Sequence, residues 1–234
     1  MSENAAIVAT GVGKSFPMGR QTVTALRDVS LSLPAGTLTA LTGPSGSGKS
    51  TLLHLFAGLE RVDSGTLGVL GHQVHACTPT ELAALRLGKI GFVHQDFSLL
   101  ADLTLIENVR LPLEATGTAR GDATTAAREA MARVGLEGLE QRFPAEVSGG
   151  QQQRAAIARA IVGSRTLVLA DEPTGSLDSK TGAEIMGVLA QLRDEGVTVV
   201  LSTHNPANLT HADHIAVLHD GTLLSFDTAA GDMA

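Results

Sequence analysis

Residues 43–50 have the sequence Gly43-Pro44-Ser45-Gly46-Ser47-Gly48-Lys49-Ser50. This stretch fits the pattern G-x-x-x-x-G-K-[ST], and it lies between a β-rich run at 37–42 and a helical apolar pattern at 50–59. Glycines let the backbone curl so that successive N–H groups point at one phosphate group. The following helix presents its positive end to the same anion. The stretch therefore predicts a phosphate-binding loop, in which Lys49 bridges the β- and γ-phosphates and the Ser50 hydroxyl binds Mg²⁺.

The composition indicates a globular chain without a membrane-spanning helix of its own. The 234 residues are enough for one large α/β domain, and the hydrophobic fraction of 43% supports a packed core. The formal net charge of −7 argues against nonspecific binding of nucleic acid or anionic lipid. The longest charge-free stretch, 29–48, is interrupted by Pro34, Gly36 and Pro44. It cannot span a membrane as a helix, so any work at a membrane requires a partner.

The order of apolar patterns predicts an α/β fold with a parallel sheet. Two buried-strand patterns at 166–170 and 197–202 enclose a helical pattern at 182–195, which is typical of parallel strands joined by a right-handed crossover. The region from 79 to 161 has helical character, with helices predicted at 80–87, 104–113, 123–134 and 148–162. Half-exposed strands or hairpins are predicted at 7–10, 23–33, 65–74 and 215–225.

Two carboxylates follow the apolar strand pattern at 167–170. Asp171 at the tip of the strand suits a contact to Mg²⁺ through water, and Glu172 suits a base that polarises the attacking water. An ordinary strand that ends in a solvated acidic turn would have the same local sequence. The phosphate-binding loop upstream makes the functional interpretation the stronger one.

The segment Ser148-Gly149-Gly150-Gln151 distinguishes this chain from other phosphate-loop proteins. A serine N-cap followed by two glycines exposes backbone donors and a hydroxyl at the start of a helix, which forms a second anion site. A plain N-cap is the alternative interpretation. It does not explain why glycines, which weaken helices, occupy the first two helical positions.

Together, the phosphate loop at 43–50, SGGQ at 148–151 and the strand with its carboxylates at 167–172 resemble an ABC-type ATPase. The resemblance extends from about residue 7 to 225. It implies a P-loop NTPase fold in a single ABC ATPase domain at 1–234. A RecA-like parallel-sheet core and an antiparallel β subdomain would occupy about 1–94 and 166–234, and a helical subdomain about 95–165.

The resemblance also assigns roles to single residues. Gln95 resembles the Q-loop glutamine, Ser176-Leu177-Asp178 the D-loop and His204 the switch histidine, while Phe16 lies where an aromatic residue, often Tyr, stacks on adenine. The implied catalytic residues are Glu172, His204 and Gln95, and the implied Mg²⁺ ligands are Ser50, Gln95 and Asp171. The residues implied to bind ATP are Phe16, Gly43, Pro44, Ser45, Gly46, Ser47, Gly48, Lys49, Ser50, Thr51, Ser148, Gly149, Gly150, Gln151 and Asp178.

Partners follow from the same resemblance. In this family two subunits enclose two ATP molecules, with the P-loop of one and the SGGQ of the other on each γ-phosphate. The stretches 95–100 and 171–182 are similar to macrolide exporters, lipoprotein-releasing complexes and cell-division ATPases, although Ser176 replaces the usual Asn. This implies an ATP-dependent homodimer that drives export or mechanotransmission through a four-helix membrane permease of the FtsX/MacB-like type. The expected location is cytoplasmic and peripheral, at the inner face of the cell membrane, with no nucleic acid bound.

Other functional classes fit less well. A soluble ABC ATPase that acts on DNA or ribosomes is the alternative function. The cohesion type carries a very long coiled coil between its P-loop and SGGQ, whereas here only about 100 residues separate Ser50 from Ser148. The translation-factor type carries two ATPase cassettes in one chain, and this chain has one. A small-molecule kinase with a P-loop has no reason to contain SGGQ or the base Glu172.

Overall fold

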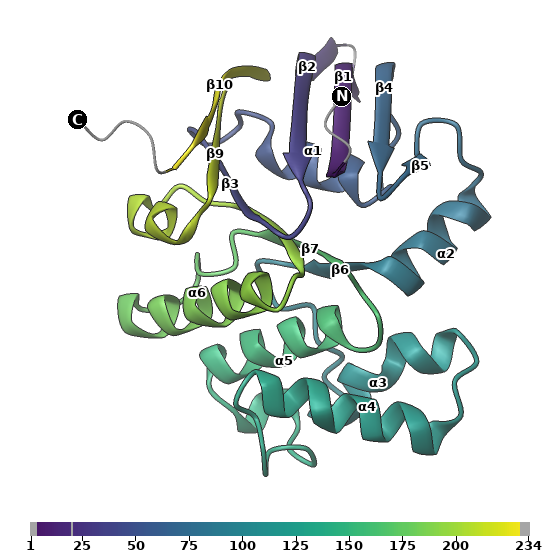
Figure 1. Cartoon of the computed structure of the whole chain (residues 1–234). Helices are drawn as coiled ribbons and strands as arrows, with labels where there is room; N and C mark the ends of the chain where they lie inside the picture. The colour runs from purple at the N-terminus through teal and green to yellow at the C-terminus, as the bar shows by residue number, and fades with distance from the viewer. Residues whose placement is uncertain (1–3, 20, 230–234) are drawn as a thin grey trace.

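Two sheets and six α-helices make up the computed structural model, which describes residues 4–19 and 21–229 (Figure 1). The two ends of the domain predicted at 1–234 therefore lie outside the described residues. The strands are β1 (Ala5–Met18), β2 (Gln21–Pro34), β3 (Leu38–Thr42), β4 (Ser64–Val69), β5 (His72–Gln73), β6 (Ile90–Val93), β7 (Leu167–Asp171), β8 (Thr198–Ser202), β9 (His214–His219) and β10 (Thr222–Thr228). The helices are α1 (Lys49–Phe56), α2 (Pro79–Lys89), α3 (Leu105–Ala115), α4 (Arg120–Arg133), α5 (Gly149–Ile161) and α6 (Ser179–Asp194), with 3₁₀ turns η1 (Pro144–Glu146) and η2 (Pro206–His211).

The larger sheet confirms the predicted α/β fold. Its strand order is β10-β9-β3-β8-β7-β6, and the pairs β3–β8, β3–β9, β6–β7 and β7–β8 are parallel. The smaller sheet, β2-β1-β4-β5, is antiparallel. Since neighbouring parallel strands end at one edge, the loops after β3, β6, β7 and β8 meet there.

Alternation along the central strands sorts their side chains between two hydrophobic clusters. Leu167 and Leu169 of β7 pack with α1 and the antiparallel sheet, whereas Val168 and Ala170 pack with α3 to α6. The strand β8 alternates in the same way. The central sheet is therefore covered on both faces, with α1 and the antiparallel sheet above and α3 to α6 below in Figure 1, which explains its continuous apolar sequence.

Strand β6 is the element that the sequence pattern did not indicate, because it lies inside the region predicted to be helical. Its four residues Ile90-Gly91-Phe92-Val93 form an edge strand that pairs with β7. A Cβ at Gly91 would overlap the Ala160 carbonyl of α5, so the glycine allows the helix to pack directly onto the strand. A run this short has no detectable period.

Several predicted helix ends shift by a few residues for identifiable reasons. Helix α1 ends at Phe56 instead of residue 59, because Gly58 adopts a left-handed conformation with φ +61°. Helix α6 begins at Ser179 instead of 182, because the Asp178 side chain caps it by accepting the N–H groups of Lys180 and Thr181.

The helices α3, α4 and α5 lie between β6 and β7 in the chain, where the helical subdomain at about 95–165 is predicted. Thr104 and Glu107 form a capping box at the start of α3, as the sequence indicated. Met131 of α4 and Ile157 of α5 join the cluster that reaches the lower face of the sheet. Within the part of the chain that the structure describes, no helix is long and apolar enough to cross a membrane.

Asp213 attaches the start of β9 to β3. Its Oδ2 accepts the Leu38 N–H at 2.8 Å, and its Oδ1 accepts from Arg193 Nη1 at 2.6 Å. Burial raises the pKa of Asp213, but the Arg193 guanidinium and the Leu38 N–H outweigh burial and hold that pKa below its usual range. The ionised carboxylate therefore stabilises the fold.

Asp213→Asn is expected to lower the free energy of unfolding by about 1 kcal/mol at pH 7, because a charge-assisted bond is lost. A depressed pKa contributes stability above the unfolded value of 3.8, and that contribution disappears as the pH falls through the folded pKa. The stabilities that urea titrations give for the two proteins should therefore converge as the pH falls below 3.8 and through the folded pKa of Asp213. Asp227→Asn, at an exposed position on β10, is the control. A difference that stays constant with pH would contradict this role of the charge.

Candidate functional site

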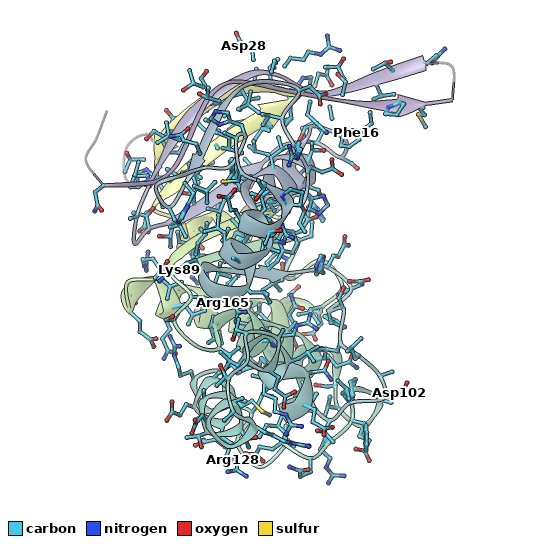
Figure 2. All side chains as sticks on the ribbon, turned by 90° about the vertical axis from the view of Figure 1, so that its right-hand side faces the viewer. Phe16, Asp28, Lys89, Asp102, Arg128 and Arg165 are labelled. Atoms are coloured by element: carbon cyan, nitrogen blue, oxygen red, sulfur yellow. The ribbon has the colours of Figure 1, made fainter. Side chains whose placement is uncertain are left out.

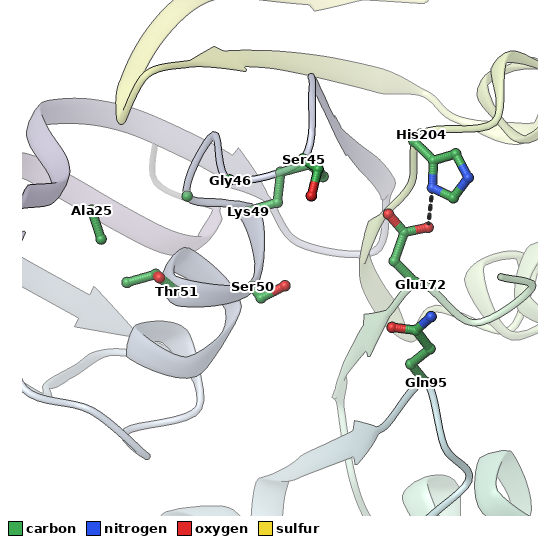
Figure 3. A pocket seen from close by; sticks show the side chains of 10 residues that line it. Ala25, Ser45, Gly46, Lys49, Ser50, Thr51, Gln95, Glu172 and His204 are labelled. Atoms are coloured by element: carbon green, nitrogen blue, oxygen red, sulfur yellow. Dashed lines mark hydrogen bonds and ion pairs between the residues drawn. The ribbon is translucent and has the colours of Figure 1, made fainter. Parts of the chain in front are cut away.

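A cavity of about 560 Å³ opens at the edge where the parallel strands end (Figure 3). The residues that line it come from the loop after β3, the first turn of α1, and the ends of β6, β7 and β8, with Ala25 from β2. They are Ala25, Ser45, Gly46, Gly48, Lys49, Ser50, Thr51, Gln95, Glu172 and His204. The fold thus brings together residues from four distant segments that the sequence assigned to one site.

The predicted phosphate loop wraps the start of α1 and leaves that helix end without a side-chain cap. Helices α2, α3, α5 and α6 begin with a capping side chain, whereas the N-cap of α1 is Gly48, which has φ +101° and no side chain; the N-cap of α4, Ala119, makes no side-chain cap either. Gly43 has φ +142°, and a Cβ there would overlap the Leu218 carbonyl of β9. A free helix N-terminus facing a polar cavity is a binding site for an anion such as phosphate.

Lys49 folds back over the loop. Its ammonium donates to the carbonyls of Gly43 and Pro44, at 2.9 Å each, and only 7% of the residue is exposed. These contacts hold the positive charge at the mouth of the curled backbone. The charge and the N–H groups of the loop therefore attract the same anion.

Asp171 accepts hydrogen bonds from two hydroxyl groups. Its Oδ1 accepts from Ser50 Oγ at 2.9 Å and from Ser202 Oγ at 2.6 Å. Ser202 Oγ also accepts the Glu172 N–H at 2.9 Å, and Ser202 is fully buried. One serine on β8 thus holds both carboxylate residues at the tip of β7. Ser50, Asp171 and the nearby Gln95 offer oxygen donors, which suits Mg²⁺.

Glu172 has a left-handed backbone with φ +47°, which is uncommon for a residue other than glycine. Its Oε2 lies 3.0 Å from His204 Nδ1, and its side chain is 16% exposed compared with 68% for His204. A proton on Nδ1 would orient the carboxylate toward the cavity. Strained backbone of this kind persists only where the surrounding contacts hold it, and here the Ser202 hydroxyl provides one such contact.

His94, which precedes Gln95, completes a row of three rings between α1 and β6, in which neighbouring rings are tilted by 40° and 43°. The centroid of its ring is 4.5 Å from that of Phe92, which is 5.5 Å from that of His54. Burial lowers the pKa of His94, which favours the neutral ring. The neutral imidazole therefore packs here as an aromatic ring.

Phe16 and Asp178 lie away from the cavity lining. Phe16 is on β1 near the end of the β1–β2 hairpin, with the Lys14 ammonium 5.0 Å from its ring centroid (Figure 2). Asp178 caps α6, and the Thr181 hydroxyl and N–H hold the pKa of its carboxyl below the usual range. Their assignment to ATP binding stays a prediction.

The SGGQ segment begins α5 and does not line the cavity either. Ser148 and Gln151 form a capping box: Ser148 Oγ accepts the Gln151 N–H at 3.3 Å, and Gln151 Oε1 accepts the Ser148 N–H at 2.9 Å. The hydroxyl thus serves as the predicted N-cap, and Ser148 is exposed. Within one chain the SGGQ segment and the phosphate loop do not share a cavity, and the assignment of SGGQ to ATP binding stays a prediction.

Sequence reasoning missed residues that act through their neighbours. The Ser202 hydroxyl bonds to the Asp171 carboxylate and to the Glu172 N–H. Gln153 of α5 donates from Nε2 to the Pro173 carbonyl at 2.7 Å. Both side chains are fully buried. A polar residue closing the apolar run Val199-Val200-Leu201 is the one sequence signal that could have identified Ser202.

Comparison with known proteins agrees with this geometry. Residues 26–175 match the family model described as ABC transporter. The macrolide export ATP-binding/permease protein MacB of Salmonella choleraesuis is 44% identical over 213 residues, which is 91% of this chain and 33% of that protein. MacB of Escherichia coli K12 is 41% identical over the same shares. The chain spans about a third of the length of these curated relatives.

Solved structures match over nearly the whole chain. A dimeric post-hydrolysis state of the ATP-binding cassette MJ0796, bound to ADP and Pi, is 36% identical with a TM-score of 0.89. A second dimeric structure of MJ0796, described as a bacterial ABC transporter cassette, is 37% identical with the same TM-score. Each alignment covers 97% of this chain and 100% of the other.

Proposed function

The chain belongs to the ABC transporter family as an ATPase cassette, and we propose on this premise that it hydrolyses ATP in a two-subunit site to drive a membrane permease. The observation that carries the proposal is the single cavity that joins the uncapped start of α1 with Lys49, Glu172, Gln95 and His204. An assay of phosphate release from ATP by the purified chain tests it. No phosphate release, with the chain folded and dimeric, would contradict the ATPase assignment.

The chemistry follows from the positions of these groups. The triphosphate lies along the phosphate loop, where Lys49 and the N–H groups of α1 neutralise its negative charge. Water attacks the γ-phosphorus, the bond from that phosphorus to the β–γ bridging oxygen breaks, and ADP leaves. Glu172 accepts the proton of the attacking water, and His204 holds the carboxylate through the 3.0 Å contact. Because phosphoryl transfer depends on positioning and charge, these residues account for most of the protein's contribution.

Mg²⁺ fits the donors at the tip of β7. Ser50, Asp171 and Gln95 supply oxygen atoms, which are the ligands that this ion prefers. When bound with ATP, the ion would neutralise charge on the β- and γ-phosphates. Asp171 is held for this role by the Ser202 hydroxyl.

The second subunit would supply the SGGQ segment to each site. MJ0796, which matches the whole fold, is described as dimeric, and the two half-sites of the present chain are separate. Internal packing explains Gly150, because a Cβ there would overlap the Thr181 methyl group. It does not explain Gly149, where a Cβ would make only ordinary contacts, 3.6 Å from Leu177 and 3.8 Å from Phe97. We assign the need for glycine at 149 to close approach of the other subunit's nucleotide.

Gly149→Ala is therefore expected to leave folding and ATP binding by the monomer intact while weakening the ATP-induced dimer about tenfold or more, or about 1.4 kcal/mol. Size-exclusion chromatography across a range of protein concentrations, with ATP and a Glu172→Gln background that blocks turnover, measures this. Gly88→Ala in α2, where a Cβ would meet open space, is the matched control. Equal dimer affinity in the two variants would remove this assignment of Gly149.

The proposal that the partner is a membrane permease rests on the relatives of the chain. The curated MacB relatives are named as ATP-binding/permease proteins, and this chain matches about a third of their length. A four-helix permease of the FtsX/MacB-like type would dock near residues 95–110, where Leu100 is 49% exposed, and would hold the cassette at the inner face of the cell membrane. Copurification of a membrane protein with the chain from its native membranes would identify the partner.

A further inference from the structure

The segment that follows Gln95 has an unusual backbone. Phe97 and Ser98 both adopt left-handed conformations, with φ +62° and +47°. Residues other than glycine rarely adopt this conformation, and two in succession persist only where the surrounding contacts hold them. Phe97 lies only two residues after Gln95. Contacts that hold the Phe97–Ser98 backbone in place therefore also restrict the position of the Gln95 side chain.

Arg159 of α5 holds both residues. Its Nη1 donates to the Ser98 carbonyl at 2.6 Å, and its Nη2 donates to the Phe97 carbonyl at 3.0 Å. Arg159 is half-buried, and the carboxylate of Asp96, which accepts the Ser98 hydroxyl at 2.6 Å, attracts its charge. The planar guanidinium fork bonds two carbonyls at once, whereas a lysine ammonium acts as a single point charge.

The same helix touches the other parts of the site. Phe97 packs near Gly149 at its first turn, since the Phe97 Cζ lies 3.8 Å from the place of a Cβ on Gly149. Gln153 bonds the carbonyl of Pro173, the residue that follows the left-handed Glu172. Helix α5 thus contacts the two strained segments that carry Gln95 and Glu172.

We propose that Arg159 is a positioning residue for Gln95: it holds the left-handed Phe97–Ser98 segment and so fixes Gln95 in the nucleotide cavity. The inference rests on the proposed ATPase function and deepens it. It also couples Gln95 to the helix that begins with SGGQ.

Arg159→Met removes the fork while keeping an apolar stem of similar length. We expect kcat for ATP hydrolysis to fall by about 10- to 100-fold, since misplacement of about 1 Å has this effect, while KM for ATP changes less than about twofold because the phosphate loop is intact. Arg159→Lys, which preserves charge and folding, should show a smaller loss of kcat in the same direction.

Arg154→Met is the matched control on the same helix. Arg154 also donates to a backbone carbonyl, that of Val134 at 3.0 Å, and to Glu184, and neither bond involves Phe97 or Ser98. We expect its kcat to match that of the unmodified chain. If Arg159→Met and Arg159→Lys both fold and retain full kcat, the proposal is wrong.

A double-mutant cycle with Gln95→Ala separates positioning from general loss of structure. If Arg159 acts through Gln95, the loss of kcat caused by Arg159→Met should shrink to within about twofold in the Gln95→Ala background. An equal loss in both backgrounds would overturn the inference while leaving the ATPase function standing. An unmodified chain that fails to hydrolyse ATP would instead count against the proposed function.

Discussion

Glu172→Gln is expected to lower kcat for ATP hydrolysis by about 10²- to 10⁴-fold, the range found for loss of a general base. The amide has the size of the carboxylate and can still accept from His204, so the cavity keeps its shape. It cannot accept a proton from the attacking water. Affinity for ATP should change little, because Lys49 and the start of α1 are unaffected.

Because this variant should bind ATP without hydrolysing it at the normal rate, we expect it to accumulate as an ATP-bound dimer. Single-turnover hydrolysis gives the rate, and size-exclusion chromatography with and without ATP gives the oligomeric state. Glu129→Gln, at an exposed position on α4, makes the same chemical change outside the site and should hydrolyse ATP at the unmodified rate. Hydrolysis by Glu172→Gln at that rate would remove the general-base assignment.

Lys49→Ala should have the largest effect on binding. Its loss removes the ammonium from the mouth of the loop and leaves the carbonyls of Gly43 and Pro44 without this donor. A hydrogen bond from a charged group contributes about 1.5–3 kcal/mol, so ATP should bind about 10- to 100-fold more weakly.

Isothermal calorimetry with ATP measures the change directly. Lys89→Ala, an exposed lysine at the end of α2, controls for loss of one positive charge. Both variants should unfold at similar urea concentrations, since the loop fold depends on its glycines and on packing against β9. If Lys49→Ala binds ATP with unchanged affinity, the phosphates do not bind beside Lys49.

Structural features that depend on interactions between neighbouring residues could be predicted from the sequence alone. The phosphate loop, the capping box at Thr104 and the N-cap at Ser148 each depend on residues within a few positions of one another. The parallel pair β7 and β8 was also predictable, because strands buried on both faces have continuous apolar sequences.

The features that could not be predicted from the sequence depend on contacts between segments that are distant in the chain. Strand β6 exists because β7 offers it an edge and Gly91 lets α5 approach, and neither fact is visible in four residues. Ser202 and Arg159 resemble any buried serine or helical arginine until the fold brings them to Asp171 and to the Phe97–Ser98 turn. Residues that act through a neighbour carry no motif of their own.

The close contact of Gly43 with Leu218 has a consequence for the order of synthesis. The phosphate loop emerges from the ribosome some 170 residues before β9, yet β9 lies beside it, and β3 pairs with both β8 and β9. A nascent chain therefore carries a complete loop sequence without the neighbour that shapes it. Such long-range pairing is slow to form, so competence to bind nucleotide should arise late in translation, once Leu218 has left the exit tunnel.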